Sequence, residues 1–301
     1  MSRLNVFLNR PVYWFRPVQV FSRLRDCTPR GVTDVVVSWG GSIHCNTGEL
    51  IGKTLQHQGI YDLVVSEVIC RLVPPGGTAL DVGANIGHMS GLMAKSAGRL
   101  GRVIAFEPSS RLRPTLMRNV EQWNRNPGFA QIDVRCSAAS DCDGSSRIYY
   151  PIEIFSSNQG TASLENSWLN AVDSSDSEEI QTTTLDSLLA SNPDLHIDLL
   201  KIDVEGHELA VFRGAAKLLG GRHIKHIVFE EYATYPSPVQ DLLMSHGYRI
   251  YRLSRNFVRI QLRPAGEASK DIDFEPNYLA TLDVPAAEQA LASWGWRALR
   301  G

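Results

Sequence analysis

Residues 80–87 read LDVGANIG, and this stretch decides the fold because it joins a predicted strand to a predicted helix. The apolar run Thr78–Val82 predicts a short buried strand, and a helix is expected over about Gly87–Ser96. The small residues of the turn allow backbone N–H groups to approach a ligand closely. A turn of this kind, at the carboxyl end of a strand in an α/β sheet, is a typical place for a nucleotide or nucleoside.

The turn differs from the dinucleotide pattern GxGxxG, because Asn85 stands where that pattern has its second glycine. Asp81 also places a carboxylate at the end of the strand, where we expect it to point at the pocket. This carboxylate would repel a pyrophosphate but would attract a ligand that carries a sulfonium and an ammonium group. The sequence therefore favours S-adenosylmethionine over NAD.

Strands and helices alternate on both sides of this turn. Further strands are predicted over Arg102–Phe106, Gln131–Ser137, Asp198–Ile202 and Ile224–Glu230. Helices are predicted over Tyr61–Leu72, Arg111–Trp123, about His207–Leu219 and about Pro238–His246. This alternation predicts an α/β fold with a mostly parallel, doubly wound sheet that helices cover on both faces.

Three regions depart from the alternation. The C-terminal part has strand-like segments at Tyr248–Leu253, Phe257–Leu262 and Asn277–Leu282, which predict antiparallel strands at one edge of the sheet. Residues 140–184 contain a predicted strand, Ser145–Tyr150, and a long polar excursion that is a candidate lid. Residues 1–60 are expected to form an arm or cap that packs on a domain of residues 61–301.

Charged residues gather at the predicted strand ends. Glu107 ends the second strand, where an acidic side chain can accept hydrogen bonds from both hydroxyls of a ribose. Lys201, Asp203 and Glu205 alternate at the end of the fourth strand and would point to one side if the strand continued. Asp203 would then lie near a methyl donor and its acceptor. The alternative is an ion pair between Lys201 and one of the two carboxylates.

Four residues are candidates for the general base that takes the proton of an acceptor hydroxyl. They are Asp203, Glu205, Glu230 at the end of the fifth strand, and His207 at the start of a predicted helix. Asp203 and Glu205 could also bind a divalent metal ion, but the sequence fixes no third oxygen ligand, so no metal site is predicted.

The chain resembles the FkbM family of S-adenosylmethionine-dependent methyltransferases over about Tyr61 to Leu282. The matching stretches are LDVGANIGHMS, VIAFEPS, Asn119 in LMRNV, SAASDCDG, TTLDSLL, IDLLKIDVEGHELAVFRGA, IVFEEY and NYLA. The block KIDVEG is much more specific than the glycine turn. One departure is His88, which stands where the family usually has an aromatic residue.

The resemblance implies a Rossmann-like class I methyltransferase fold and roles for individual residues. Asp203 and Glu205 would line the reaction centre. The cofactor contacts would come from Asp81, Gly83, Asn85, Gly87 and Glu107, with Ser137, Ala138 and Asp141 on the adenine side. The family suggests a hydroxyl of a sugar, polyketide or other secondary metabolite as the methyl acceptor.

The amino-acid composition limits the kinds of partner that the protein is expected to bind. A formal net charge of −2 gives no basic footprint for nucleic acid. The five cysteines are scattered without metal-ligand spacing, which favours reduced thiols in a cytoplasmic protein, and no membrane span is expected. The aromatic N-terminal arm suggests a homodimer. Two other functions stay open at this point, an NAD-linked oxidoreductase and a non-catalytic S-adenosylmethionine-binding subunit.

Overall fold

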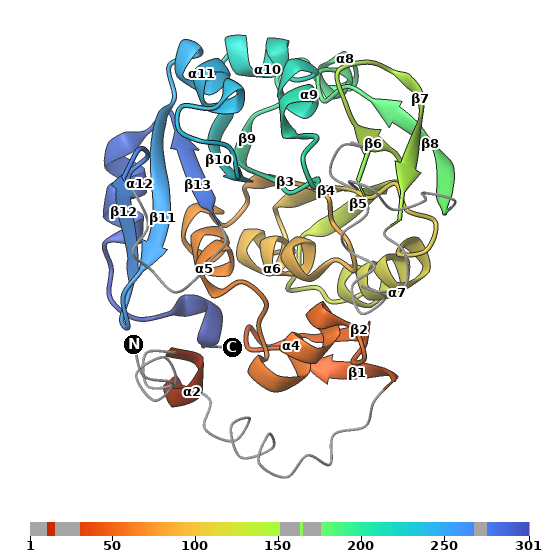
Figure 1. Cartoon of the computed structure of the whole chain (residues 1–301). Coiled ribbons are helices and arrows are strands. Elements are labelled where there is room, and N and C mark those ends of the chain that lie inside the picture. The colour runs from red at the N-terminus through yellow and green to blue at the C-terminus, as the bar shows by residue number, and fades with distance from the viewer. Residues whose placement is uncertain (1–10, 16–30, 151–162, 165–175, 268–275, 301) are drawn as a thin grey trace.

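The computed structural model describes residues 11–15, 31–150, 163–164, 176–267 and 276–300. Its central feature is an eight-stranded sheet with the order β12-β11-β13-β10-β9-β3-β4-β5 (Figure 1). The neighbours from β10 to β5 pair in parallel. These parallel strands are β3 (Thr78–Val82), β4 (Arg102–Phe106), β5 (Gln131–Arg135), β9 (Ile197–Ile202) and β10 (Ile224–Glu230).

The parallel strands form because their apolar runs are buried on both faces of the sheet. In β3, for example, Ala79, Leu80 and Val82 are at most 1% exposed. The predicted bounds of β3, β4 and β10 are confirmed, and β9 begins one residue earlier than expected. The predicted strand Gln131–Ser137 ends at Arg135, because the chain then leaves this sheet.

The antiparallel edge is also confirmed. Strand β13 (Asn277–Thr281) lies between β10 and β11 (Arg249–Arg255) and runs antiparallel to both. Strand β12 (Ile260–Pro264) completes this edge. The strand that comes last along the chain is therefore interior to the sheet.

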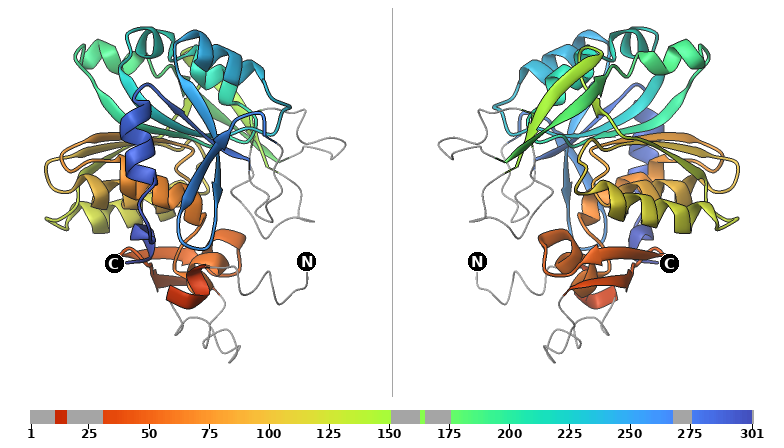
Figure 2. Two further views of the ribbon diagram at one scale, coloured as in Figure 1. Left: turned by 90° about the vertical axis from the view of Figure 1, so that its left-hand side faces the viewer. Right: turned by 90° about the vertical axis from the view of Figure 1, so that its right-hand side faces the viewer.

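Helices cover both faces of the sheet, as Figure 2 shows from two sides. One face carries α5 (Leu63–Leu72), α6 (His88–Ala97), α7 (Arg113–Asn124) and α12 (Val284–Leu291). The other face carries α8 (Ser187–Ser191), α9 (Glu208–Arg213), α10 (Ala216–Gly220) and α11 (Pro238–Ser245). Two separate hydrophobic clusters fill the space between the sheet and these helices.

The helix predicted over His207–Leu219 is two helices, α9 and α10. The break lies at residues 214–215, and Gly214 packs so closely on Ser140 that a Cβ atom would lie 1.9 Å from the Ser140 carbonyl oxygen. The requirement for this contact cannot be recognised from the local sequence, which favours an unbroken helix.

The described part of the N-terminal region packs on the main domain, and its residues 39–44 contact α6 and α7. It contains α2 (Pro11–Phe15), a hairpin of β1 (Val32–Val36) and β2 (Ser42–Asn46), and α4 (Leu50–Gln58). Trp39 follows β1 and lies 5.9 Å from Trp123 of α7 between ring centroids. Residues from both regions belong to one hydrophobic cluster.

A second, three-stranded sheet stands beside the carboxyl end of the parallel strands. It consists of β6 (Ala138–Ala139), β7 (Gly144–Tyr149) and β8 (Ser177–Thr183) in the order β6-β8-β7. Strand β7 begins and ends one residue before the predicted strand Ser145–Tyr150. Most of the candidate lid, residues 151–162 and 165–175, lies outside the described residues. Within the described ranges, the helices are all too short or too polar to cross a membrane.

Candidate functional site

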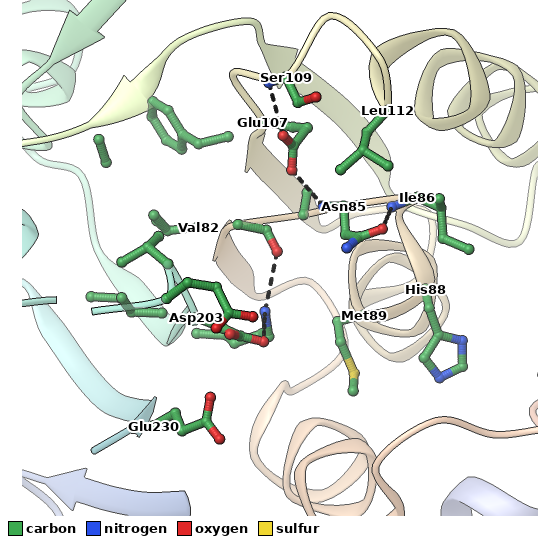
Figure 3. A pocket seen from close by; sticks show the side chains of 18 of the residues that line it. Val82, Asn85, Ile86, His88, Met89, Glu107, Ser109, Leu112, Asp203 and Glu230 are labelled. Carbon is green, nitrogen blue, oxygen red and sulfur yellow. Dashed lines mark hydrogen bonds and ion pairs between the residues drawn. The ribbon is translucent and has the colours of Figure 1, made fainter. Parts of the chain in front are cut away.

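A cavity of about 300 Å³ opens at the carboxyl ends of β3, β4, β9 and β10 (Figure 3). Its walls come from segments that are far apart in the sequence. Leu50 and Ile51 of α4 contribute to one wall, and Ile148 of β7 and Leu164 contribute to another. The cavity therefore requires the N-terminal region, the main sheet and the second sheet together.

The glycine turn packs tightly on the end of β9. Gly83 has φ +80°, and a Cβ atom there would lie 1.9 Å from the Asp203 carbonyl oxygen. The Asp203 amide in turn donates to the Val82 carbonyl at 3.1 Å. Gly83 and Asn85 line the cavity, whereas Gly87 begins α6 and packs on Trp123. The turn thus fixes the end of β9 as well as the cavity wall.

Glu107 lies at the end of β4, with its carboxylate held by two backbone donors. The amide of Asn85 donates to Oε2 at 2.8 Å, and the amide of Ser109 donates to Oε1 at 2.9 Å. The side chain lines the cavity although the residue is only 5% exposed. Burial raises the pKa of Glu107 to about 7. Each oxygen keeps a lone pair for a further donor, such as a ribose hydroxyl.

Asp81 differs from the expectation that it points at the pocket. Its side chain is fully buried and does not line the cavity. Oδ2 accepts a hydrogen bond from the Ser90 hydroxyl at 2.5 Å, and Oδ1 lies 3.4 Å from the Lys201 ammonium. Asp81 therefore supports the site from outside the cavity, through its contacts with Ser90 and Lys201.

Lys201 connects Asp81 to the cavity. Its ammonium lies 3.4 Å from Asp203 Oδ2 and 3.3 Å from the Gly83 carbonyl oxygen, to which it donates. Burial lowers the pKa of Lys201, but Asp203 and Asp81 outweigh this effect and raise it above its ordinary value. Lys201 is therefore charged, and the ion pair considered as an alternative is present with Asp203.

Glu205 also lines the cavity, although β9 ends at Ile202 and the expected strand alternation does not reach it. Its backbone turns into the left-handed region with φ +54°. Burial, followed by the charges of Asp203 and Glu230, raises the pKa of Glu205 to about 8. This carboxyl group is poised to exchange a proton near neutral pH.

Glu230, at the end of β10, lines the cavity on the side away from Glu107 (Figure 3). The Tyr232 hydroxyl donates to its Oε1 at 2.5 Å. Burial and the neighbouring Asp203 raise the pKa of Glu230 to about 7. The carboxyl groups of residues 203, 205 and 230 therefore belong to one electrostatic cluster on this side.

The remaining predicted site residues are divided between the cavity and its surroundings. Ala138 of β6 lines the cavity, whereas Ser137, Asp141 and His207 do not. The His207 ring pairs with the Ser140 hydroxyl at 2.9 Å, between Nε2 and Oγ. His207 is therefore poorly placed for proton transfer in the cavity.

Sequence reasoning did not single out Asp62 or the contact that it makes. Asp62 lines the cavity, begins α5, and accepts from the amides of Val64 and Val65, both at 3.0 Å. The Asn277 amide group donates to its other oxygen at 2.9 Å, which joins β13 to α5. An aspartate before an apolar helical run signals a helix start, but not a cavity.

His88 lines the cavity and is nearly fully buried. Its Nε2 accepts from the Tyr61 amide at 3.4 Å, and burial lowers the pKa of His88 to about 3. It is therefore a neutral imidazole that packs against the start of α5. Within the described ranges, no group of three or more His, Cys, Asp or Glu residues is arranged to hold a metal ion.

The strand order and the turn between β3 and α6 define a Rossmann-like class I methyltransferase fold with antiparallel C-terminal strands. The chain belongs to the FkbM family of methyltransferases, because the family model for the methyltransferase FkbM domain matches residues 81–250, more than half of the chain. The resemblance drawn from the sequence is confirmed. The matched domain is that of an S-adenosylmethionine-dependent methyltransferase, and S-adenosylmethionine is its cofactor.

Similar proteins include the AMB antimetabolite synthetase AmbE of Pseudomonas aeruginosa, which is 28% identical over 227 residues. That match covers 63% of this chain and 10% of the synthetase, so the chain spans about a tenth of this relative's length.

Two solved structures are similar to this chain at low identity. An FkbM methyltransferase from Methylobacillus flagellatus is 15% identical with a TM-score of 0.42, over 68% of this chain and 43% of that one. An S-adenosylmethionine-dependent O-methyltransferase from Thermotoga maritima is 15% identical with a TM-score of 0.40, over 83% of this chain and 77% of that one.

Proposed function

We propose that the protein transfers a methyl group to a hydroxyl of a small molecule, such as a sugar, a polyketide or another secondary metabolite, with Glu205 as the general base. The observation that carries this proposal is the pair Glu205 and Glu230, which line one cavity with pKa values raised to about 8 and about 7. A general base is most effective when its pKa lies near the working pH.

We propose that the donor half of the cavity is built around Glu107. Its carboxylate is oriented by backbone donors and has acceptor capacity left for ribose hydroxyls. Gly83, Asn85 and Ala138 line the wall beside it, and these residues fit a nucleoside. When bound, the cofactor supplies a methyl group activated by its sulfonium. Asp81 and Gly87 would support this half from outside the cavity.

In the acceptor half, Asp203 is held in an ion pair, whereas Glu205 and Glu230 have raised pKa values. The charged Lys201 pairs with the Asp203 carboxylate, with its ammonium 3.4 Å from Oδ2. For Glu205 and Glu230, burial and the charge of Asp203 raise the pKa, so both carboxylates bind a proton tightly. Glu205 would therefore take the acceptor proton, while Glu230 and Tyr232 orient the acceptor. Much of the rate would come from holding the two reactants in line.

Two observations support a small-molecule acceptor. The cavity volume of about 300 Å³ is at the lower end of the range of small-molecule sites. The similar protein from Pseudomonas aeruginosa is an antimetabolite synthetase by name, which agrees with an acceptor from small-molecule biosynthesis. The net charge of −2 offers no support for a nucleic-acid acceptor.

The test is a screen of hydroxylated sugars, polyketides and other metabolites with labelled S-adenosylmethionine, using wild type, E205Q and the control E121Q. Glu121 is a well-exposed residue of α7. We expect a labelled O-methyl product with wild type and E121Q, and a loss of about a hundredfold or more in E205Q, within the range of general-base catalysis.

Calorimetric titration with S-adenosylhomocysteine and with NAD separates this proposal from its alternatives. Binding of S-adenosylhomocysteine alone, together with turnover, supports the methyltransferase. Binding without turnover of any acceptor would indicate a non-catalytic subunit. Full activity of E205Q would reject Glu205 as the base and leave Glu230 as the remaining candidate.

A further inference from the structure

Ser163 and Leu164 are the described part of the chain between β7 and β8 that reaches the cavity. Ser163 pairs with Tyr149 of β7 through two backbone hydrogen bonds, at 3.0 and 3.2 Å. Ser163 is 2% exposed, and the next residue, Leu164, lines the cavity. The second sheet therefore places the buried Ser163 at the edge of the cavity.

The hydroxyl of Ser163 donates to the main-chain carbonyl oxygen of Glu205 at 2.6 Å. Glu205 has φ +54° and Gly206 has φ +97°, so two successive residues adopt the left-handed region. A residue with a Cβ atom disfavours this region, and it persists there only when neighbouring contacts fix it. A hydrogen bond to the Glu205 carbonyl can therefore fix this left-handed backbone conformation.

Glu208 holds the same loop from the other side. Its Oε1 accepts from the amide of Val204 at 3.2 Å and from the amide of Gly206 at 3.3 Å. Ser163 and Glu208 therefore bind two peptide groups around Glu205, one between residues 203 and 204 and one between residues 205 and 206. With the loop so fixed, the Glu205 carboxyl group faces the charges of Asp203, Glu230, Glu208 and Lys201.

We propose that Ser163 is a positioning residue, whose hydroxyl fixes the Glu205 peptide so that the Glu205 carboxyl group stays in the cavity beside Asp203 and Glu230. Ser163 acts through Glu205 and lines no part of the cavity itself. The role of Glu205 in proton transfer rests on the proposed function, but its placement by Ser163 does not. The second sheet would in this way position a residue of the acceptor half, whereas the main sheet carries the cofactor half.

The first measurement needs no acceptor. Protein labelled with ¹³C at the glutamate side-chain carboxyl carbons is titrated by NMR, and E205Q identifies the Glu205 signal. In S163A we expect the Glu205 loop to relax towards water, so that the titration midpoint falls by about one pH unit or more towards the ordinary value for glutamate. S163T, which keeps the hydroxyl, should retain the wild-type midpoint.

The controls separate positioning from a general loss of structure. The Ser245 hydroxyl donates to the Leu242 carbonyl at 2.7 Å in α11, so S245A removes a similar hydrogen bond away from the cavity. We expect S245A to titrate like wild type and S163A to keep its affinity for S-adenosylhomocysteine within about twofold, because the donor half is intact. S163C, which keeps the size but weakens the donor, should give an intermediate midpoint if S163A does not fold.

An unchanged Glu205 midpoint in folded S163A or S163C would overturn the inference. With an acceptor from the screen, S163A should lose about ten- to a hundredfold in kcat/KM, as expected for a displaced reacting group. Full activity of E205Q, with a shifted midpoint in S163A, would reject the proposed base and leave the positioning role standing. The experiments can therefore reject either proposal without rejecting the other.

Discussion

At the scale of single residues, unusual backbone conformations concentrate at the cavity. Asp62, Asn85 and Glu205 line it and have φ values of +40°, +53° and +54°. Each such residue costs on the order of 1–3 kcal/mol, which the surrounding hydrogen bonds must offset. Asp62 has its helix-capping contacts, and Asn85 accepts from the Ile86 amide through its own side chain. The site is thus held in one shape by contacts that do not depend on a ligand.

The raised pKa of Glu205 has a consequence for stability. Because the folded protein binds the Glu205 proton more tightly than the unfolded chain, this group stabilises the fold fully below its ordinary pKa of 4.5, and the stabilisation is lost as the pH rises through about 8. We expect E205Q, which is uncharged at every pH, to gain in melting temperature relative to wild type between pH 5 and pH 9. Thermal unfolding at several pH values measures this difference.

E121Q serves as the control, because Glu121 is well exposed and should give a difference from wild type with little dependence on pH. Part of the pH dependence will remain in E205Q, since Glu230 and Glu107 also have raised pKa values. A melting-temperature difference that stays constant from pH 5 to pH 9 would contradict the raised pKa of Glu205.

The sequence allowed some site residues to be predicted and not others. Glu107 and Glu230 stand at the ends of strongly apolar strands, so their place at one sheet edge follows from a parallel sheet. The burial of Asp81 was missed, because it depends on Ser90 and Lys201 from other elements. Ser163 could not be found, since its partner is 42 positions away in a segment with no regular pattern.

At the scale of elements, one buried side chain connects the N-terminal hairpin to the rest of the fold. Asn119 of α7 accepts from the amide of His44 in β2 at 2.7 Å and donates to the carbonyl of His44 at 3.0 Å. It also donates to the carbonyl of Ile86 in the glycine turn at 2.9 Å. Hairpin, helix and cofactor turn therefore share one fully buried amide group.

Replacing this amide should destabilise the protein substantially. N119A leaves buried polar groups of His44 and Ile86 without a partner, and each costs on the order of 1–3 kcal/mol. We expect urea unfolding to show a loss of about 2–4 kcal/mol in the free energy of unfolding. N126A, at an exposed turn where the side chain accepts from the Gly128 amide, should lose about 1 kcal/mol or less. Equal losses in the two variants would contradict the bridging role.

Elements were predicted best where burial is two-sided. The strands β3, β4 and β10 consist mainly of buried residues, and their bounds follow directly from the sequence. Strands β11 and β12 begin one and three residues later than predicted, because both are partly exposed and their limits are less marked in the sequence. The helix α12 was not predicted, although Asp283 and the following proline signal its start.

At the scale of the whole molecule, a buried ion pair joins helix α5 to residues near the C-terminus. Arg71 Nε lies 2.5 Å from Glu67 Oε1, and both side chains are at most 3% exposed. Arg71 donates to the carbonyls of Ala290 and Gly295, at 3.0 and 2.7 Å. Glu67 accepts from the amides of residues 297 and 298. The pair therefore fixes residues 290–298 to helix α5.

Removing one partner should leave the other buried and unpaired. We expect E67A to lose about 3–5 kcal/mol in the free energy of unfolding, as for other broken buried pairs. The control E121A removes an exposed pair with the same spacing, Glu121 and Arg125, and should change stability by about 1 kcal/mol or less. Chemical denaturation followed by circular dichroism measures both. Similar values for the two variants would show that the pair does not hold the two regions together.

The interior position of β13 bears on how the protein is made. During synthesis, β10 and the β11–β12 hairpin leave the ribosome before Asn277–Thr281, the strand that must lie between them. Until β13 arrives, β10 presents an unpaired edge, which is a template for association with other chains. The nascent chain is therefore exposed to aggregation until residues 277–281 have been translated and the sheet is complete.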